Sequence, residues 1–431
     1  MKDKNLINYN SAKYLLPDWV QNICLNPQKS QGSYLYDDKS ERRILDFYNF
    51  FSTLPLGYNH TVFNSEAFRS DLLTFGGLKP STGRILTSFF DNFVLEFNDF
   101  VNGQIFNKYF FIHGGGLAVE NALKISFDWK RNINKLSGHH IDSSEMEVLS
   151  LVNGFHGITG YGLSLSTNEL KCNHYPKFDW PKFEPSCASW IDGTKFKTSN
   201  STSNRLAKIE NYIEKRGKEK ISSIIIELIQ GGGGDQHLCK NFVIGLKNIC
   251  KKNDILLIID EVQTGFGTSG KLWCYEHYGV EPDLLTFGKK AQISGVCINR
   301  RIPNISEVIN VPGRLSPTWN GDISDYVRCK YIMKTYQKDG LIENASTLGQ
   351  YILSSLKEMN TFLNVRGRGF LIAFDFESTE KRNQYEKLCF DNGLFLLPMR
   401  EFTLRMRPNM ALTKSEADNA LEIMDKVNRM I

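Results

Sequence analysis

Short apolar runs alternate with amphipathic stretches through the middle of the chain. The runs contain many β-branched residues and lie at 108–112, 148–152, 223–227 and 255–259. Runs of this kind are typical of strands that are buried on both faces of a parallel sheet. Because stretches of helical periodicity separate them, the pattern predicts an α/β fold with a doubly wound, mostly parallel sheet.

The remainder of the chain divides around this alternation. We predict an N-terminal arm that forms part of a small domain at 1–60, a large domain at 61–314 and a smaller C-terminal α+β domain at 315–431. The expected elements of the C-terminal domain are a helix, a strand with glycine punctuation and an amphipathic helix, at 325–338, 367–374 and 414–429.

Composition and charge narrow the function classes. The chain has 431 residues, of which 41% are hydrophobic and 23% charged, as in ordinary globular proteins. The net charge of +5 is small and spread out, so we expect no nucleic-acid partner. Neither a membrane span of roughly 18–20 apolar residues nor an apolar signal core is present, so we expect a cytoplasmic protein without membrane contact. The nine cysteines show no metal-ligand spacing, which indicates reduced thiols and no metal.

Charged residues follow two of the apolar runs. Asp260 comes directly after the run at 255–259, and the segment 284–288 leads into Lys289 and Lys290. A carboxylate at the end of a buried strand needs a charged or hydrogen-bonding partner. Pyridoxal phosphate requires such a pair, because a lysine forms its Schiff base and an acid keeps its pyridine nitrogen protonated. A purely structural ion pair between two strands accounts equally well for these residues alone.

Glycine-rich and aromatic segments follow other predicted strands. Gly114–Gly116 opens a helix, where backbone N–H groups can approach a phosphate, although a tight turn without ligand has the same appearance. The spacing of these glycines differs from the Rossmann and Walker patterns. Phe155 could stack on a flat ring or simply pack, and Gly231–Gly234 must form an unusual loop. All lie at the carboxyl ends of predicted parallel strands, where ligands of such sheets bind, which favours a cofactor site.

The order of these segments resembles a known family, the class III, fold-type I pyridoxal-phosphate aminotransferases, and within it the L-lysine 6-aminotransferases. The likeness covers nearly the whole chain. It rests on segments at 32–35, 110–130 (FFIHGGGLAVENALKISFDWK), 175–181, 260–267 (DEVQTGFG), 287–290 (FGKK), 318–319, 366–369 (RGRG), 405 and 407–408. The resemblance implies pyridoxal 5'-phosphate, a homodimer whose sites form at its interface, and an amine or amino acid with a keto acid as substrates.

The resemblance also implies a role for each matching residue. Lys289 would carry the Schiff base, with Lys290 as the less favoured choice, and Asp260 would pair with the pyridine nitrogen. The other implied cofactor contacts are Gln263 at the ring hydroxyl, Phe155 and Val262 against the cofactor, Gly115 and Gly116 at the phosphate, and Thr318 at the phosphate from the partner subunit. Arg405 would grip a substrate carboxylate, a role that suits its two-pronged donor geometry.

Three positions depart from the family pattern around the substrate. Ile158 replaces an arginine that helps bind the substrate carboxylate, and Ser316 replaces an asparagine near the same group. Gly232 replaces the glutamate that neutralises the counterpart of Arg405 while an amine-end substrate binds. We therefore expect Arg405 to have no partner from that loop and to recruit another acid, an anion or water, because an unpaired buried arginine is costly.

These features together predict a pyridoxal-phosphate aminotransferase with an altered substrate pocket. It would move an amino group from a primary amine or amino acid, such as the terminal amine of an L-lysine-like donor, to a keto acid such as 2-oxoglutarate. Another reaction of the same cofactor on an α-amino acid, such as decarboxylation, is an alternative. A catalytically weak paralogue that serves as a binding or regulatory protein is the second.

Overall fold

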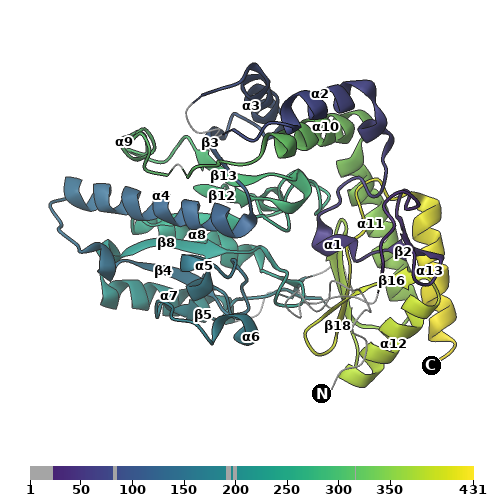
Figure 1. Ribbon diagram of the computed structural model, residues 1–431. Coiled ribbons are helices and arrows are strands. Elements are labelled where there is room, and N and C mark those ends of the chain that lie inside the picture. Colours follow the sequence, from purple (N-terminus) through teal and green to yellow (C-terminus); the bar gives the residue numbers. More distant parts are fainter. Residues whose placement is uncertain (1–22, 81–84, 191–195, 198–200, 316) are drawn as a thin grey trace.

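A seven-stranded sheet lies at the centre of the larger part of the molecule (Figure 1). The computed structural model describes residues 23–80, 85–190, 196–197, 201–315 and 317–431, so Ser316 lies outside the described residues. In spatial order the strands are β3 (Phe106–Ile112), β13 (Ser294–Asn299), β12 (Leu284–Phe287), β11 (Leu256–Asp260), β8 (Ile221–Ile226), β4 (Glu147–Leu151) and β5 (Lys182–Phe183). β13 runs antiparallel to β12 and β3, whereas the pairs from β12 to β5 are parallel. The predicted α/β fold with a mostly parallel sheet is confirmed.

Both faces of this sheet are covered by helices. Leu256 and Ile258 of β11 belong to the apolar core beneath α4 (Gly115–Leu136). Leu257 and Ile259 belong to the core on the opposite face, together with residues of α8 (Lys240–Lys252). Since successive side chains of a strand point to opposite faces, an uninterrupted apolar run is what a doubly covered strand needs.

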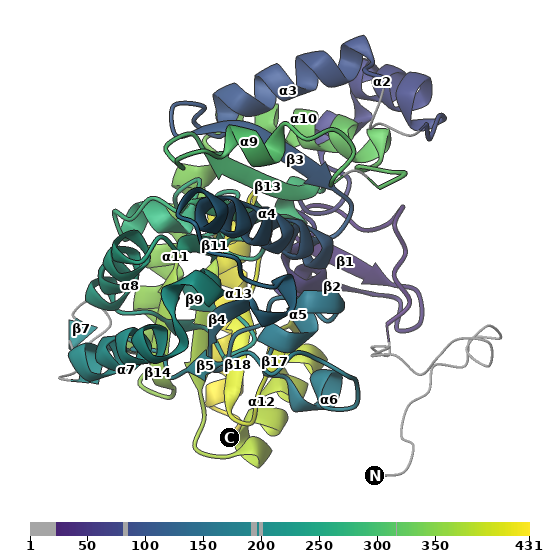
Figure 2. The ribbon, with the colours of Figure 1, turned by 90° about the vertical axis from the view of Figure 1, so that its left-hand side faces the viewer.

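Further helices surround the sheet and its edge. α2, α3 and α10 gather beside β3 (Figures 1 and 2). The remaining helices and short elements before α10 are α1 (Asn49–Ser52), η2 (Thr61–Asn64), α2 (Glu66–Gly76), α3 (Ser88–Phe100), η3 (Ser143–Glu145), α5 (Gly160–Leu165), α6 (Glu169–Cys172), β6 (Ser189–Trp190), β7 (Phe196–Lys197), α7 (Ser201–Arg216), η4 (Lys218–Lys220), β9 (Ile229–Gln230), β10 (Gln236–His237), η5 (Cys274–His277), η6 (Lys289–Ala291) and α9 (Ser306–Ile309). No helix of the described residues is long and apolar enough to cross a membrane.

A four-stranded antiparallel sheet forms the smaller part, beside the carboxyl edge of the large sheet (Figure 1). Its elements, with α10 leading into them, are α10 (Ile323–Asp339), α11 (Leu341–Glu358), β14 (Leu363–Arg368), β15 (Leu371–Asp375), α12 (Thr379–Asp391), β16 (Leu394–Phe395), β17 (Leu397–Met399), β18 (Thr403–Met406) and α13 (Lys414–Asn428). The prediction of one strand at 367–374 is wrong. Gly369, with φ of +53°, reverses the chain there, so that β14 and β15 form a hairpin.

The N-terminal segment joins the C-terminal part of the molecule. β1 (Tyr34–Asp37) pairs with β2 (Arg42–Asp46), and β2 pairs in parallel with β16. The residues that follow, Asn49 to Ser52, form one left-handed turn with positive φ at every position. The domain limits near residues 60 and 314 stay a prediction.

Candidate active site

Asp260 ends β11 and lies buried at the carboxyl edge of the large sheet. One carboxylate oxygen accepts hydrogen bonds from the Thr286 hydroxyl at 2.9 Å and the Val262 N–H at 3.1 Å. The other lies 2.8 Å from Nδ1 of His156, which is also buried. Burial alone would lower the pKa of His156, but the hydrogen bond and charge of Asp260 raise it above its usual value. Asp260 is therefore held in place by three hydrogen-bonding partners, one of which is the buried imidazole of His156.

Lys289 follows β12, the strand next to β11, and adopts a φ of +48°. Its Nζ makes no hydrogen bond or ion pair with any described residue. Burial and the neighbouring Arg405 and Arg407 lower its pKa to about 8, although Asp260 opposes this shift. Lys290, in contrast, donates a hydrogen bond to Ser52. Burial lowers the pKa of Lys290 as well, to about 7, so the two lysines differ in their hydrogen bonds, and Lys289 is the one whose amine is uncommitted.

The first turn of α4 forms an anion-binding cradle. Gly114 has φ of +103°, no side chain caps the helix, and its first turn holds no acidic residue. A Cβ on Gly115 would stand 2.7 Å from Cγ1 of Val262, so only glycine fits between the helix and that side chain. The first N–H groups of a helix lack partners within it, and they attract an anion together with the helix dipole.

The loop between β4 and α5 packs against this cradle. Gly157 has φ of +98°, and a Cβ there would lie 3.0 Å from Cα of Gly116. Ser166 fixes the loop, because its hydroxyl accepts from the N–H of His156 and donates to the carbonyl of Gly157. Phe155 and Ile158 are 37% and 49% exposed, so both side chains face open space and remain accessible to a ligand.

Glu227 is a further acid at this edge, and in the sequence it stands out only as the end of an apolar run. It accepts hydrogen bonds from the N–H groups of Phe155 at 2.8 Å and Gly231 at 3.2 Å. Burial raises its pKa to about 7, and the nearby Asp260 contributes in the same direction. The signal that could have found it is the one used for Asp260, an acid directly after an apolar run.

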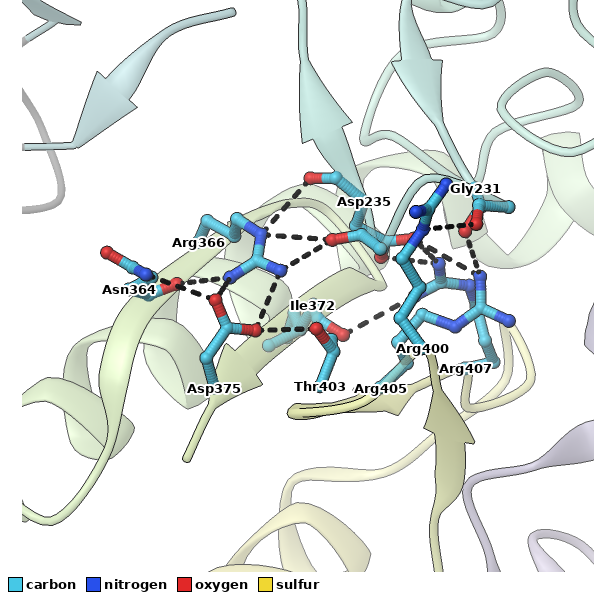
Figure 3. A network of polar contacts seen from close by, with 12 residues as sticks. Gly231, Asp235, Asn364, Arg366, Ile372, Asp375, Arg400, Thr403, Arg405 and Arg407 are labelled. Carbon is cyan, nitrogen blue, oxygen red and sulfur yellow. Dashed lines mark hydrogen bonds and ion pairs between the residues drawn. The ribbon is translucent and has the colours of Figure 1, made fainter. Parts of the chain in front are cut away.

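The loop Gly231–Asp235 joins the large sheet to the smaller part through arginines (Figure 3). Arg405, on β18, donates to the carbonyl of Gly231 at 2.8 Å and to the carboxylate of Asp235 at 3.3 Å. Arg407 donates to both carboxylate oxygens of Asp235. Burial tends to raise the pKa of Asp235, but the two guanidinium groups lower it below its usual range.

The expectation that Arg405 has no partner from that loop is therefore wrong, because it binds the Gly231 carbonyl, whereas the expectation that it recruits another acid is confirmed by Asp235. The loop closes a hairpin between β9 and β10, and Asp235, with φ of +56°, supplies the acid three positions after Gly232. Burial and Arg407 still lower the pKa of Arg405 to about 10, and its Nε has no partner among the described residues. Asp235, shared between two arginines, only partly compensates Arg405.

Close packing explains two glycines of this loop. A Cβ on Gly231 would lie 1.7 Å from Oε1 of Gln263, and a Cβ on Gly232 would lie 3.1 Å from Cβ of Phe155. Gln263 and Phe155 thus occupy the space beside the loop. The substrate-side position Gly232 borders directly on the aromatic side chain expected at the cofactor.

Thr318 is the one described candidate that the chain does not bring to this site. It lies exposed in the segment between α9 and α10, next to Trp319, whose indole donates to the carbonyl of Lys79. The structure brings together the other described candidates: Asp260, Lys289, Val262, Gln263, Gly115, Gly116, Phe155, Ile158, Gly232 and Arg405. His156 and Asp235 were missed, because each acts through a partner more than a hundred residues away.

Comparison with known proteins identifies the class. The class-III aminotransferase family matches residues 15–427. The L-lysine-epsilon aminotransferase of Amycolatopsis lactamdurans is 33% identical over 96% of this chain and 93% of its own length. That of Mycobacterium tuberculosis is 35% identical over 93% and 90%. The solved structure of lysine aminotransferase from M. tuberculosis in the internal aldimine form superposes with a TM-score of 0.91, at 33% identity and 97% coverage of both chains.

The chain belongs to the class III aminotransferases. It is a fold-type I, pyridoxal-phosphate-dependent enzyme that resembles lysine epsilon-aminotransferases. The residues present fit this cofactor: an uncommitted lysine, an anchored carboxylate and a helix N-terminus without a side-chain cap come from neighbouring elements at one edge of the sheet. The ornithine aminotransferase of Toxoplasma gondii, with a TM-score of 0.80 at 20% identity, shares the fold.

Proposed function

We propose that the enzyme transfers the terminal amino group of an L-lysine-like primary amine or amino acid to a keto acid such as 2-oxoglutarate. The observation that carries this proposal is the position of Lys289 next to the anchored Asp260. The two residues come from the ends of neighbouring strands, and the amine of Lys289 has no partner among the described residues. A buried Arg405 on the facing β18 supplies the group for a substrate carboxylate.

Each cofactor contact has a candidate residue. Lys289 would hold pyridoxal phosphate covalently, Asp260 would face the pyridine nitrogen, and the first turn of α4, with Gly115 and Gly116, would bind the phosphate. Phe155 and Val262 would contact the cofactor, and Gln263 would reach its hydroxyl. When bound, the cofactor supplies an electron-accepting ring that stabilises negative charge on the carbon beside the amino group.

Lys289 is also suited to move the proton. With a pKa lowered to about 8, its Nζ can accept a proton from the substrate carbon that carries the amino group and return it at the adjoining position. Arg407 helps to keep the pKa of this amine low. A general base works best when its pKa lies near the working pH.

A homodimer would complete the site. Thr318 is exposed, and so are the large apolar side chains of Phe50, Phe51, Leu117 and Trp319, at 40–48%. Exposed apolar side chains of this size favour a protein contact, and a second copy could bring its Thr318 to the phosphate. A cytoplasmic location is proposed as well, in keeping with nine unpaired cysteines.

The donor end of the pocket is where this chain departs from its relatives. Ile158 cannot bind a carboxylate, and the role of Ser316 stays a prediction. Gly232 supplies no acid, but Asp235 gives Arg405 a buried partner. Since Arg405 is partly compensated without an acid at 232, the departures favour an altered donor preference over decayed activity.

Three proteins test the proposal: the wild type, Lys289→Ala and the matched control Lys290→Met. We expect the wild type and Lys290→Met to carry the visible absorbance of bound cofactor and to form glutamate from 2-oxoglutarate with an amine panel that includes L-lysine. Lys289→Ala should lose turnover, because both the covalent link and the base are removed.

Two results would contradict the proposal. Release of carbon dioxide from an α-amino acid, without glutamate formation, would indicate decarboxylation. A wild type that binds no cofactor would favour a binding or regulatory protein.

A further inference from the structure

Four arginines converge on the loop Gly231–Asp235, but only two carboxylates form ion pairs with them among the described residues (Figure 3). Arg366 makes a two-pronged pair with Asp375. Arg405 and Arg407 share Asp235. The fourth, Arg400, makes no ion pair within the part of the chain that the structure describes, although Glu401 is its neighbour in sequence.

Arg400 is nevertheless held in a defined place. It lies exposed between β17 and β18, where its Nε donates to the carbonyl of Gly232 at 3.2 Å and its Nη2 donates to the side-chain oxygen of Asn153 at 2.7 Å. Both acceptors are neutral, and its Nη1 has no acceptor among the described residues. The guanidinium is thus oriented while its charge remains uncompensated.

The backbone of Arg400 is held in an uncommon conformation. Its φ of +51° lies in the left-handed region that arginine rarely adopts, whereas Asn153, with φ of +68°, is of a residue type that adopts this region more readily. Such conformations persist only where the surroundings enforce them, and they gather at ligand sites. A glycine at 400 would relieve the strain and remove the cation.

The position of Arg400 relates it to the candidate active site. The residue whose carbonyl it binds, Gly232, lies against Phe155, and the carbonyl of the preceding Gly231 binds Arg405. Because consecutive Cα atoms lie about 3.8 Å apart, the two guanidinium groups lie within roughly 10 Å of each other. Arg405 is buried, whereas Arg400 is exposed.

We propose that Arg400 is a specificity-determining residue that binds the second carboxylate of a dicarboxylic keto acid whose first carboxylate meets Arg405. This inference rests on the proposed function and names the acceptor class for the same site. Ile158 supplies no charge where the family has an arginine, whereas Arg400 supplies one from the smaller part of the molecule. Its free Nη1 and planar fork suit a carboxylate.

Binding of unreactive acids tests this without turnover. Glutarate carries two carboxylates and butyrate one, and calorimetric titration of the cofactor-loaded protein gives the affinity of each. We expect Arg400→Gln to lower the affinity for glutarate about tenfold or more, because a charge-assisted contact is lost. The affinity for butyrate should stay unchanged. Arg400→Lys should retain part of the affinity, and Arg301→Gln, an exposed arginine paired with Glu281, should behave as wild type.

Steady-state kinetics provide the second readout. With Arg400→Gln, KM for 2-oxoglutarate should rise about tenfold, while KM for pyruvate, KM for the amine and kcat should stay within about twofold. A purely structural clamp would instead lower the melting temperature and weaken both acids equally.

Equal losses for the two acids, no loss, or no glutarate binding by the wild type would overturn the inference. A selective loss of glutarate binding in a protein that transfers no amino group would retain Arg400 as a carboxylate site and reject the proposed function. The two failures are therefore distinguishable.

Discussion

Two regions of the molecule differ in how they are built: the cofactor edge, where Asp260 and Lys289 lie, and the arginine loop, Gly231–Asp235. At the cofactor edge, Asp260 and Lys289 follow adjacent strands of one sheet, and register alone brings them together. At the loop, Gly231 and Arg405 are 174 residues apart, and Gly231 lies in a hairpin loop while Arg405 lies on a strand of the four-stranded sheet. The first region depends on strand ends within a rigid layer, and the second depends on how two parts of the molecule meet.

This difference has a functional consequence. Strand ends buried on both faces hold catalytic groups in place at little entropic cost, which suits chemistry that is common to a family. A loop of glycines held by arginines can change its partners by single substitutions, which suits substrate choice. Gly232 lies in the loop, and Ile158 belongs to the segment of Phe155, which packs against Gly232, whereas the residues of the cofactor edge match the family.

Removing Asp235 should have the largest effect on the loop. Asp235→Asn leaves Arg405 and Arg407 buried without a carboxylate, so we expect the free energy of unfolding to fall by about 3–5 kcal/mol. Its folded pKa is lowered, so its stabilisation is present above about pH 4 and is lost as the pH falls through the folded value. Urea titration at pH 7 measures the change.

Asp375→Asn is the matched control for this variant. Asp375 is less buried and pairs with Arg366 alone, so its removal should cost less. Equal losses in the free energy of unfolding for the two variants would show that sharing Asp235 between two buried arginines adds nothing to its stabilising effect.

Asp260→Asn tests the cofactor edge in the same manner. An asparagine keeps the shape but removes the charge, so we expect kcat to fall about 10²–10³-fold with little change in stability. The control is Asp283→Asn, because Asp283 accepts from Lys247 and from Leu257 N–H at the other end of the same strand. If the control lost as much activity, the position of Asp260 at the carboxyl end would not matter.

Lys289 should carry a stability penalty in the cofactor-free protein. Its folded pKa of about 8 lies below the usual value, so folding disfavours the charged amine at pH 7. We expect Lys289→Met to raise the free energy of unfolding by about 1 kcal/mol at pH 7. The gain should shrink as the pH rises from about 8 to 10.5, where the folded amine is already neutral. A gain that grows with pH would reverse the sign and contradict the lowered pKa.

Ile158→Arg should have a smaller effect on turnover than Asp260→Asn, and it tests whether a charge at position 158 selects the substrate. Ile158 is 49% exposed, so an arginine fits there without repacking. We expect kcat/KM for L-lysine to rise by up to about tenfold, with Ile158→Gln as the uncharged control. Introducing an acid at position 232 would require Phe155 to move, because a Cβ there would lie 3.1 Å from Cβ of Phe155. An equal gain with glutamine would show that charge is not the missing feature.

The two regions also differ in how well the sequence predicted them. Asp260 and Lys289 could be found because each follows an apolar run, and parallel strands place their ends on one edge. The hairpin at Gly369 was missed, since the run on both sides of it reads as one strand. Arg400 and Asp235 could not be found, because their roles depend on contacts 168 and 170 residues away that no local pattern encodes.

The most direct test of the central claim is the identity of the cofactor-bearing lysine. Borohydride reduction of the purified protein fixes the bond between lysine and cofactor, and tandem mass spectrometry of its peptides locates it. We expect the phosphopyridoxyl group on Lys289, whose amine is uncommitted, and none on Lys290, which is bound to Ser52. The group on Lys290 or elsewhere, or no modified lysine in a protein that binds the cofactor, would contradict the account.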